Sequence, residues 1–413
     1  MEITRRSAGR LAGTAAAVAL LRAGHARAAD ETVKVGITLP FTGADAESAV
    51  QIADGAILAF DQANENHTVP GVTFEYVKLD NGTATAGQYD PAQAATNARK
   101  LASDPQVVAN IGPEMSGSGK AMAPILSQAD LATITPSSTN PDITNPKFAA
   151  QFTPAGKAIY FRTVTTDAYQ GPNMANFMAE TLKIKSVYVL DDSGAYGVGI
   201  ADSYQAQAEK KGVKVLGRDR LDPKAADYSA VMTKIKSLNP DALYYGGVMQ
   251  AGVKVAKQSY ESMPKLIKAG GDGVYTVEML NAVGFPAAEG WYASIAAPHL
   301  TADPSAKKFV ADFQKKFPGV TVDDYSITAY CGALVIIDAV KTVKASGKEL
   351  TRSNVRDAIQ TTHIRTLLGP TSFDKYGDLT DKTVSIFQFK HNPNGKPDDL
   401  LDQTVYIGSA PEA

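Results

Sequence analysis

Residues 107–119 read VVANIGPEMSGSG, and this stretch decides the fold class. The apolar run from Val107 to Ile111 is typical of a buried parallel strand, and a loop of Gly and Ser followed by a helical pattern comes directly after it. Residues 131–141, LATITPSSTNP, repeat the arrangement one β-α unit later. Because free N–H groups at the start of a helix favour an anion, two such loops on neighbouring strands predict a crevice for a small carboxylate.

Strands and helices alternate on both sides of these loops. Upstream, residues 33–39 and 74–79 read as strands, and an amphipathic helix is expected over 49–64. A second round with similar spacing begins near Ala158 and continues to about Ile295. The alternation predicts an α/β fold of two doubly wound, Rossmann-like lobes with parallel sheets.

The remaining segments connect or complete these two rounds. The polar insert Asn81–Tyr89 is expected to be a surface loop, and Ser409–Ala413 is expected to be frayed. A late strand is predicted over 384–389. Three further helices, which we expect to pack back on the first lobe, cover residues 305–317, 325–346 and 351–359.

Charge and cysteine content exclude several classes of protein. The chain has 413 residues with 41 basic and 43 acidic side chains, and this near balance argues against a nucleic-acid-binding surface. The single cysteine, Cys331, rules out an internal disulfide and lies in an apolar helical pattern, so we expect a buried, inert thiol.

The N-terminus has the pattern of an export signal. Arg5 and Arg6 supply the basic region, Leu11–Leu21 the apolar stretch, and Ala26–Ala28 a small-residue cleavage site. We therefore predict a signal peptide over residues 1–28, cleaved near Ala28, and a mature protein in the periplasm. Both the general and the twin-arginine export routes remain open from these residues.

Catalytic and cofactor motifs are missing from the sequence. It has no Gly-x-Gly-x-x-Gly after the first strand, no P-loop, no His-Glu-x-x-His and no Gly-x-Ser-x-Gly. We therefore expect no cofactor, no metal site and no catalytic residues. The histidines after the signal are expected at the surface, namely His67, His299, His363 and His391. The pairs Asp191-Asp192 and Asp323-Asp324 are expected to be loop caps or solvated pairs.

Several motifs, in their order and spacing, resemble the periplasmic branched-chain amino-acid binding proteins of ATP-driven importers. The motifs are LPFTG (39–43), the 112–119 loop, PSSTNP (136–141), YQGP (169–172), DDSGAYG (191–197), DALYYGG (241–247) and GGDG (270–273). The resemblance covers essentially the whole mature chain. It implies a type I periplasmic binding protein, in which two lobes joined by three hinge crossovers close on a solute.

The resemblance also implies the domain bounds and the partners. Lobe 1 would comprise residues 31–160 and 299–378, and lobe 2 residues 161–298 and 379–410. The hinge strands would lie near Arg162, Pro298 and Asp381. The expected partners are a small solute with a carboxylate and an ABC permease in the inner membrane, and the chain is expected to be a monomer.

Three residues of the two loops match the positions at which the resembled family binds the carboxylate of its solute. By resemblance, the hydroxyl and N–H of Ser116 would hold the solute carboxylate, and Ser137 would contribute a backbone contact. Thr139 would touch both the carboxylate and the ammonium group. Helix capping is the structural alternative for Ser116 and Thr139.

Three further residues carry over to the opposite side of the cleft. Tyr196 matches a second-lobe tyrosine that covers the solute, and Asp272 stands where the family has an acidic partner for the ammonium. Tyr325 matches an aromatic near the side-chain pocket. Asp272 in Gly-Gly-Asp-Gly has an ordinary turn as its alternative, and the two tyrosines have core packing.

The chain departs from the family where side-chain selectivity is set. Ser48 replaces an aromatic residue over the solute side chain, Val248 replaces a second-lobe tyrosine, and Met115 replaces one cysteine of a small disulfide. We predict a solute-binding protein for a small, possibly branched-chain amino acid, and not an enzyme. Aromatic or aliphatic carboxylates, a ligand-sensing role, and a hydrolase or lyase using Asp272 and Tyr196 are the alternatives.

Overall fold

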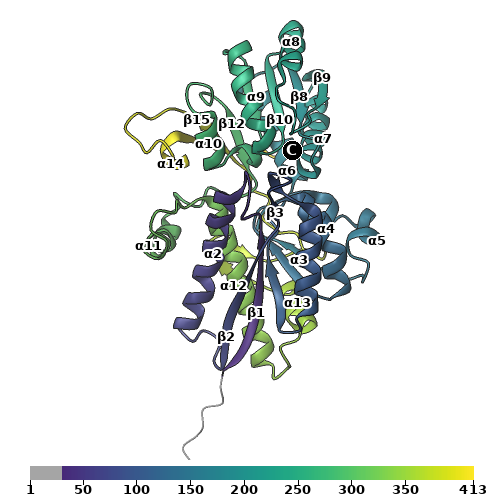
Figure 1. Ribbon diagram of the computed structural model, residues 1–413, viewed down its shortest axis with the longest axis vertical. Helices are drawn as coiled ribbons and strands as arrows, with labels where there is room; N and C mark the ends of the chain where they lie inside the picture. The colour runs from purple at the N-terminus through teal and green to yellow at the C-terminus, as the bar shows by residue number, and fades with distance from the viewer. Residues whose placement is uncertain (1–29) are drawn as a thin grey trace, which may run out of the picture.

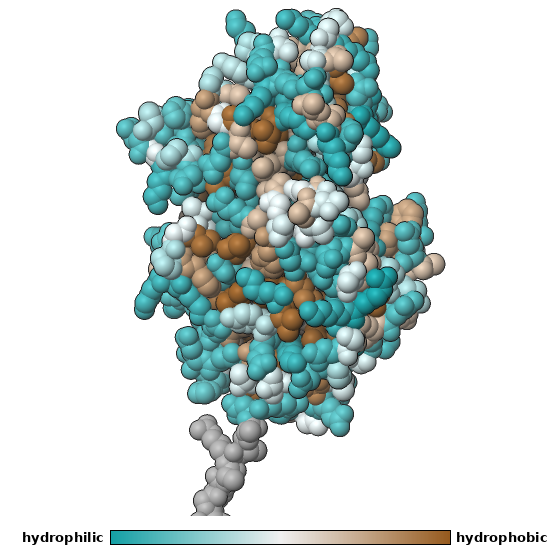
Figure 2. Space-filling model, in the orientation of Figure 1, coloured by the Kyte–Doolittle hydropathy of each residue, from teal (hydrophilic) through white to brown (hydrophobic). Residues whose placement is uncertain are grey.

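The computed structural model describes residues 30–413, so the predicted signal peptide lies outside the described residues. Two α/β lobes lie one above the other along the long axis of the molecule, with a narrow waist between them (Figure 1). Figure 2 shows a mostly hydrophilic face on which hydrophobic residues form patches broken by polar ones.

The first lobe is built on a parallel sheet of five strands in the order β2-β1-β5-β6-β7. Its strands are β1 (Glu31–Leu39), β2 (Val72–Asp80), β5 (Val107–Ile111), β6 (Ala132–Thr135) and β7 (Tyr160–Arg162). All the neighbouring pairs are parallel. This order brings the ends of β5 and β6 side by side, as the two hydroxyl-rich loops predict.

Helices cover both faces of this sheet. They are α2 (Ala46–Glu65), α3 (Pro91–Ser103), α4 (Ser116–Gln128), α5 (Ala149–Phe152), α11 (Lys307–Lys316), α12 (Asp324–Ala345) and α13 (Arg352–Gln360). The predicted cap of α3 is confirmed, because the Asp90 side chain accepts hydrogen bonds from the backbone N–H groups of Ala92 and Gln93. The helices after the second lobe pack back on the first, as expected.

Helix α12 is the core helix of the first lobe. By length and composition it could cross a membrane, but most of it is buried inside the protein, where it packs along α2. Cys331 lies on this helix and is buried, as predicted. Its apolar residues therefore serve the core.

The second lobe is built on a sheet of seven strands in the order β16-β15-β12-β11-β10-β8-β9. The strands are β8 (Ser186–Asp191), β9 (Lys214–Arg220), β10 (Ala242–Gly246), β11 (Ile267–Gly270), β12 (Tyr292–Ile295), β15 (Ser385–Phe389) and β16 (Thr404–Ser409). The flanking helices are α6 (Asp167–Asn176), α7 (Ala195–Lys210), α8 (Ser229–Leu238), α9 (Met249–Ser262) and α10 (Val277–Val283), and the short α14 (Leu400–Gln403) precedes β16.

One edge of the second sheet departs from the expected parallel arrangement. Strand β15 is antiparallel to β12, and β16 is antiparallel to β15. The chain re-enters this lobe after residue 379, and no helix crosses the sheet between β15 and β16, so the two strands pair directly as neighbours. The prediction of a wholly parallel sheet is wrong at this edge.

The chain passes between the lobes three times. It leaves the first sheet after β7, returns to the first lobe after β12, and crosses again between β14 (Gly369–Thr371) and β15. Strand β14 pairs with β13 (Ile364–Thr366) in a small hairpin on the first lobe.

Two segments are less exposed than the sequence suggests. The insert after β2 forms a small hairpin of β3 (Gly82–Thr83) and β4 (Gln88–Tyr89) and is not a free surface loop. Asn81 is buried, and its side-chain amide donates to Ser118 Oγ at 2.9 Å. The C-terminus is held too, because the backbone N–H of Ala413 donates to Asn173 Oδ1 at 3.0 Å and so keeps the end of the chain from fraying.

One histidine prediction is also wrong. His67, His363 and His391 are exposed, as expected. The side chain of His299 is only 11% exposed, and its Nδ1 lies 3.1 Å from Asp324 Oδ2. It is partly buried because the chain crosses between the lobes at this point and α12 begins beside it.

Candidate functional site

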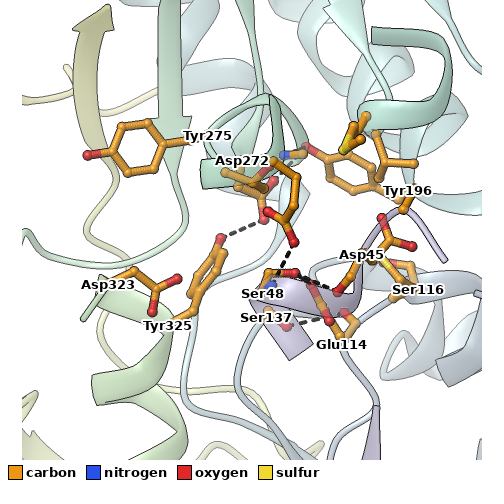
Figure 3. Close-up of a pocket in the computed structure, with 17 residues that line it drawn as sticks. Asp45, Ser48, Glu114, Ser116, Ser137, Tyr196, Asp272, Tyr275, Asp323 and Tyr325 are labelled. Carbon is orange, nitrogen blue, oxygen red and sulfur yellow. Dashed lines mark hydrogen bonds between the residues drawn. The ribbon is translucent and has the colours of Figure 1, made fainter. Parts of the chain in front are cut away.

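A cavity lies between the lobes, where the start of α4 faces the loop after β11 (Figure 3). Seventeen residues from both lobes line it, and the waist of the molecule surrounds it. They are Ala44, Asp45, Ser48, Glu114, Met115, Ser116, Ser137, Tyr196, Val248, Met249, Asp272, Gly273, Tyr275, Thr276, Glu278, Asp323 and Tyr325.

Six of the seven residues singled out from the sequence line this cavity, namely Ser48, Ser116, Ser137, Tyr196, Asp272 and Tyr325. Thr139 does not line it. Its side chain is buried beside the cavity, and its hydroxyl has no hydrogen-bond partner among the described residues. The fold therefore gathers residues that are up to 277 positions apart, from Ser48 to Tyr325, around one space.

The Asp272 carboxyl group lies in the wall of the cavity that the second lobe forms (Figure 3). Its Oδ1 accepts a hydrogen bond from the Tyr196 hydroxyl at 2.5 Å and its Oδ2 accepts one from the Tyr325 hydroxyl at 2.5 Å. Gln170 Nε2 donates to Oδ1 at 3.1 Å. Three donors thus fix the carboxyl group, and Tyr325 reaches it from the other lobe.

The glycines around Asp272 explain its local sequence. A Cβ atom on Gly271 would overlap the Tyr196 hydroxyl oxygen. On Gly273 it would overlap the carbonyl oxygen of Gly247. Glycines at positions 271 and 273 are therefore needed so that Tyr196 and the backbone at Gly247 can pack closely beside Asp272.

Burial governs the ionisation of these three groups. It raises the pKa of Asp272, while the hydrogen bonds from Tyr196, Tyr325 and Gln170 act in the opposite direction. Burial and the negative charge of Asp272 together hold the pKa of both tyrosines well above the usual value. The tyrosines therefore keep their protons and act as donors to the carboxylate.

The opposite wall contains the start of α4. Met115 precedes this helix and supplies no side-chain cap. Ser116 Oγ accepts a hydrogen bond from the backbone N–H of Asn140 at 3.2 Å. Because a hydroxyl can donate while it accepts, Ser116 and the N–H groups of the first turn remain able to bind an anion.

Ser48 joins two carboxyl groups that sequence analysis did not single out. Its hydroxyl donates to Glu114 Oε1 at 2.8 Å, and its backbone N–H donates to Glu278 Oε1 at 2.6 Å. Glu114 comes from the first lobe and Glu278 from helix α10 of the second. The second oxygen of each group, Oε2, is buried and has no hydrogen-bond partner among the described residues.

Two more carboxyl groups complete an acidic wall. Burial raises the pKa of Asp45 to about 7, and the charges of Glu278 and Asp192 act in the same direction. Burial likewise raises the pKa of Asp323, the N-cap of α12, to about 6. No lysine, arginine or histidine is among the residues that line the cavity in the described chain.

Two aspartates of the paired carboxylates act as caps. Val248 N–H donates to Asp192 Oδ2 at 2.9 Å, so the expected cap role of Asp192 is seen, although its side chain is buried and not solvated. Asp323 caps α12 as expected.

A buried acid close to Asp272 was also missed. Asp167, at the start of α6, is fully buried. Burial and the Asp272 charge raise its pKa well above the usual value. Nothing in the polar stretch around residue 167 distinguishes this residue from an ordinary helix start.

The arrangement suits an organic solute. Within residues 30–413, no three His, Cys, Asp or Glu side chains come together in a way that could hold a metal ion. The Asp272 carboxyl group of the second lobe and the N–H and hydroxyl donors at the start of α4 face one cavity, which matches a small molecule with an amino group and a carboxylate.

Comparisons with known proteins agree with this picture. A family model described as "Periplasmic binding protein" matches residues 32–396. The Leu/Ile/Val-binding protein homolog 3 of Brucella melitensis is 26% identical over 366 residues, which are 89% of this chain and 94% of that protein.

Solved structures share the fold. A leucine binding protein of Thermotoga maritima has a TM-score of 0.76 and 26% identity, covering 92% of this chain and 98% of its own. A solute binding protein from R. palustris in complex with benzoate has a TM-score of 0.74 and 19% identity, covering 93% and 98%. Because the family model spans most of the sequence, the chain belongs to the periplasmic binding protein family.

Proposed function

We propose that this protein binds an amino acid between its lobes and delivers it to an ABC permease of the inner membrane. The observation that carries the proposal is the Asp272 carboxyl group, fixed by the Tyr196 and Tyr325 hydroxyls across the cavity from the start of α4. Asp272 thus offers a negative group, and the start of α4 offers N–H donors.

Each end of an amino acid has a partner in this arrangement. Its carboxylate accepts hydrogen bonds from Ser116 and the first turn of α4, with Ser137 close by. Its ammonium group pairs with Asp272, and the charge of the solute offsets the burial of that carboxylate. Thr139 supports the site from behind the lining residues.

The known relatives support the amino-acid class. The Brucella melitensis protein carries a Leu/Ile/Val-binding name, and the Thermotoga maritima structure is described as a leucine binding protein. The altered positions 48 and 248 lie at the cavity, so we do not carry the branched-chain preference over.

Closure and export complete the proposal. The two moving bodies are residues 31–160 with 299–378 and residues 161–298 with 379–410, and a closed monomer is presented to the permease. The solute stabilises the closed form because it contacts both lobes at once. The signal over residues 1–28 directs the chain to the periplasm and is removed near Ala28.

The alternatives find less support. The R. palustris protein was solved with benzoate, yet an aromatic acid without an amino group would meet five carboxyl groups here and no basic side chain. A hydrolase or lyase would need Tyr196 to exchange a proton, which its raised pKa opposes. A sensor would use the same binding site and hand the closed form to a receptor.

A binding experiment with paired compounds tests this proposal. The protein is unfolded to remove bound solute and refolded, and each amino acid is compared with its deaminated acid by thermal shift and calorimetry. We expect binding of amino acids only. Asp272→Asn should weaken binding by about 2–5 kcal/mol, and Ser116→Ala by about 1–3 kcal/mol.

The matched control is Asp338→Asn, which removes a half-buried carboxyl group of α12 outside the cavity and should leave binding unchanged. Equal binding of amino acids and deaminated acids, with no effect of Asp272→Asn, would overturn the proposal.

A further inference from the structure

The carboxyl groups at Ser48 are more numerous than an α-ammonium group requires. Asp272 alone suffices for that group, yet Asp45, Glu114, Glu278 and Asp323 also line the cavity. Glu114 is only 7% exposed. These groups need a partner that the amino-acid proposal has not yet supplied.

The Oε2 atoms of Glu114 and Glu278 indicate which chemical group of a solute would bind beside them. Ser48 uses one oxygen of Glu114 and one of Glu278, and Oε2 of each remains buried without a hydrogen-bond partner among the described residues. Two acceptors from opposite lobes, held by the same serine, require a group with several N–H donors.

The charges around Glu114 also favour a cationic group of the solute. The groups that act on it most strongly besides burial and Ser48 are Asp45, Glu278 and Asp323, all acidic. Burial and these acids raise the pKa of Glu114 well above its usual value, so the ionised form of the cluster is unfavourable until a cation enters it. Within residues 30–413 no three of these groups are placed to hold a metal ion, and an organic cation with N–H donors fits the two free oxygens better.

We propose that the solute is a basic amino acid, whose distal ammonium or guanidinium group binds between Glu114 and Glu278. This inference rests on the proposed function, which accounts for the α-amino and carboxylate ends. An apolar side chain such as leucine would leave both Oε2 atoms without a donor, whereas a guanidinium or ammonium group satisfies both.

Ser48 is then a positioning residue. It holds Glu114 and Glu278 by its hydroxyl and its backbone N–H, and it leaves the remaining oxygens for the solute. Because Glu278 lies on the second lobe, the distal cation also bridges the lobes and favours closure.

Calorimetry on the full chain, refolded after removal of bound solute, tests the inference. The probes are arginine, lysine and ornithine, with citrulline, norleucine and leucine as matched compounds that lack the distal charge. We expect the basic amino acids to bind at least about 100-fold more tightly, a difference of about 2.7 kcal/mol. Arginine against lysine and ornithine separates a guanidinium from an ammonium preference.

Variants locate the effect. Glu114→Gln should weaken binding of the preferred basic amino acid at least about tenfold and leave leucine nearly unchanged. Glu278→Gln should act in the same way and serves if the first variant does not fold. Asp54→Asn removes a buried carboxyl group on α2, the helix of Ser48, outside the cavity, and should change neither.

The outcomes separate the two proposals. Tighter binding of leucine or norleucine than of arginine, lysine and ornithine overturns the basic side chain and leaves the amino-acid function standing. Basic amino acids that bind as tightly to both Gln variants as to the parent also overturn it. Failure of every amino acid, basic or neutral, overturns the proposed function itself.

Discussion

The cavity contains carboxyl groups that water would normally solvate, and their protonation state follows from burial. Asp45 is the clearest case, with a pKa raised to about 7, and the groups that face it are Glu114, Glu278, Asp192 and Tyr89. None of these is basic. At neutral pH the solute-free site therefore balances between a protonated and an ionised Asp45.

The stability of the solute-free protein should decrease between about pH 4 and pH 7. The folded-state pKa of Asp45 is about 7 and the unfolded value is 3.8, so the folded state binds more protons in this window. Stability falls with rising pH wherever that holds. Thermal unfolding from pH 4 to pH 8 measures the effect.

A variant separates Asp45 from the other acids. Asp45→Asn should flatten the pH dependence and stabilise the solute-free protein at pH 7 by about 1–3 kcal/mol. Asp323, with a pKa of about 6, contributes in the same direction and will leave part of the slope. A slope unchanged in Asp45→Asn would contradict this account.

Single residues show how far the sequence predicts the site. The loop pattern and the family resemblance together assign Ser116, Asp272 and Tyr325 to one binding site, and all three line the cavity. Their contacts with a solute remain a prediction. Glu114 lies within residues 107–119, but a single polar residue there is typical of any loop and does not indicate a binding role. Glu278 lies on the short helix α10, which the hydrophobic periodicity did not predict. Its proximity to Ser48 spans 230 positions and depends on closure.

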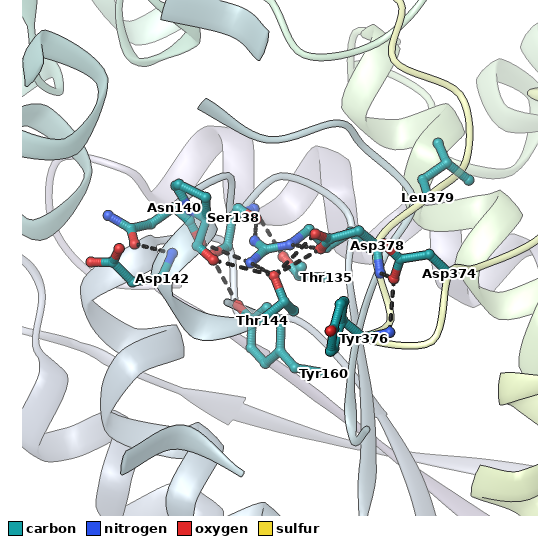
Figure 4. A network of polar contacts seen from close by, with 12 residues as sticks. Thr135, Ser138, Asn140, Asp142, Thr144, Tyr160, Asp374, Tyr376, Asp378 and Leu379 are labelled. Atoms are coloured by element: carbon teal, nitrogen blue, oxygen red, sulfur yellow. Dashed lines mark hydrogen bonds and ion pairs between the residues drawn. The ribbon is translucent and has the colours of Figure 1, made fainter. Parts of the chain in front are cut away.

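At the scale of elements, the end of β7 is tied to the segment that precedes the third passage between the lobes. Arg162 is fully buried, and its Nε donates to Asp378 Oδ1 at 2.8 Å. Its Nη2 donates to the carbonyl oxygen of Asn140 at 2.8 Å, and its Nη1 donates to that of Ser138. Figure 4 shows this network, in which Thr144 also contacts Asp378.

Loss of the arginine should destabilise the fold and the hinge together. Arg162→Met leaves Asp378 without its cation and two carbonyl groups without donors, so the free energy of unfolding should fall by about 3–5 kcal/mol. Urea denaturation followed by circular dichroism measures the change.

An exposed ion pair of similar chemistry provides the control. Lys308→Met removes the pair with Asp312 on α11, where the lysine side chain is 83% exposed, and stability should change by less than about 1 kcal/mol. Similar losses for the two variants would show that the Arg162 network has no special role.

The elements with strong local signals are the ones that the sequence predicts. Helix α3 begins at Pro91, directly after its N-cap Asp90, and β5 leads into α4, because cap chemistry and apolar runs act within a few residues. The antiparallel pair β15 and β16 was missed because strand direction depends on where the chain re-enters the second lobe. Tertiary contacts also hold the C-terminus, which local composition marks as frayed.

At the scale of the whole molecule, the structure shows the lobes in contact across the cavity. Asn140 Nδ2 donates to the carbonyl oxygen of Ala195 in the first turn of α7 at 2.8 Å. Gln250 Nε2 on the second lobe donates to the carbonyl oxygen of Ala86 in the hairpin of the first lobe at 3.3 Å. These contacts are made only when the lobes approach each other, so they favour the closed form.

The Gln250 contact lies outside the cavity and therefore tests closure separately from solute contacts. Gln250→Ala should shift the molecule toward the open form and lower the affinity for its solute by about 0.5–1.5 kcal/mol, the net value of one hydrogen bond. The melting temperature of the solute-free protein should not change, because each lobe keeps its own core. Gln205→Ala, which removes an exposed contact within α7, is the control. Small-angle scattering should show a larger radius of gyration for Gln250→Ala at subsaturating solute. An unchanged affinity and radius would mean that this contact forms without contributing to closure, and that the solute alone holds the lobes together.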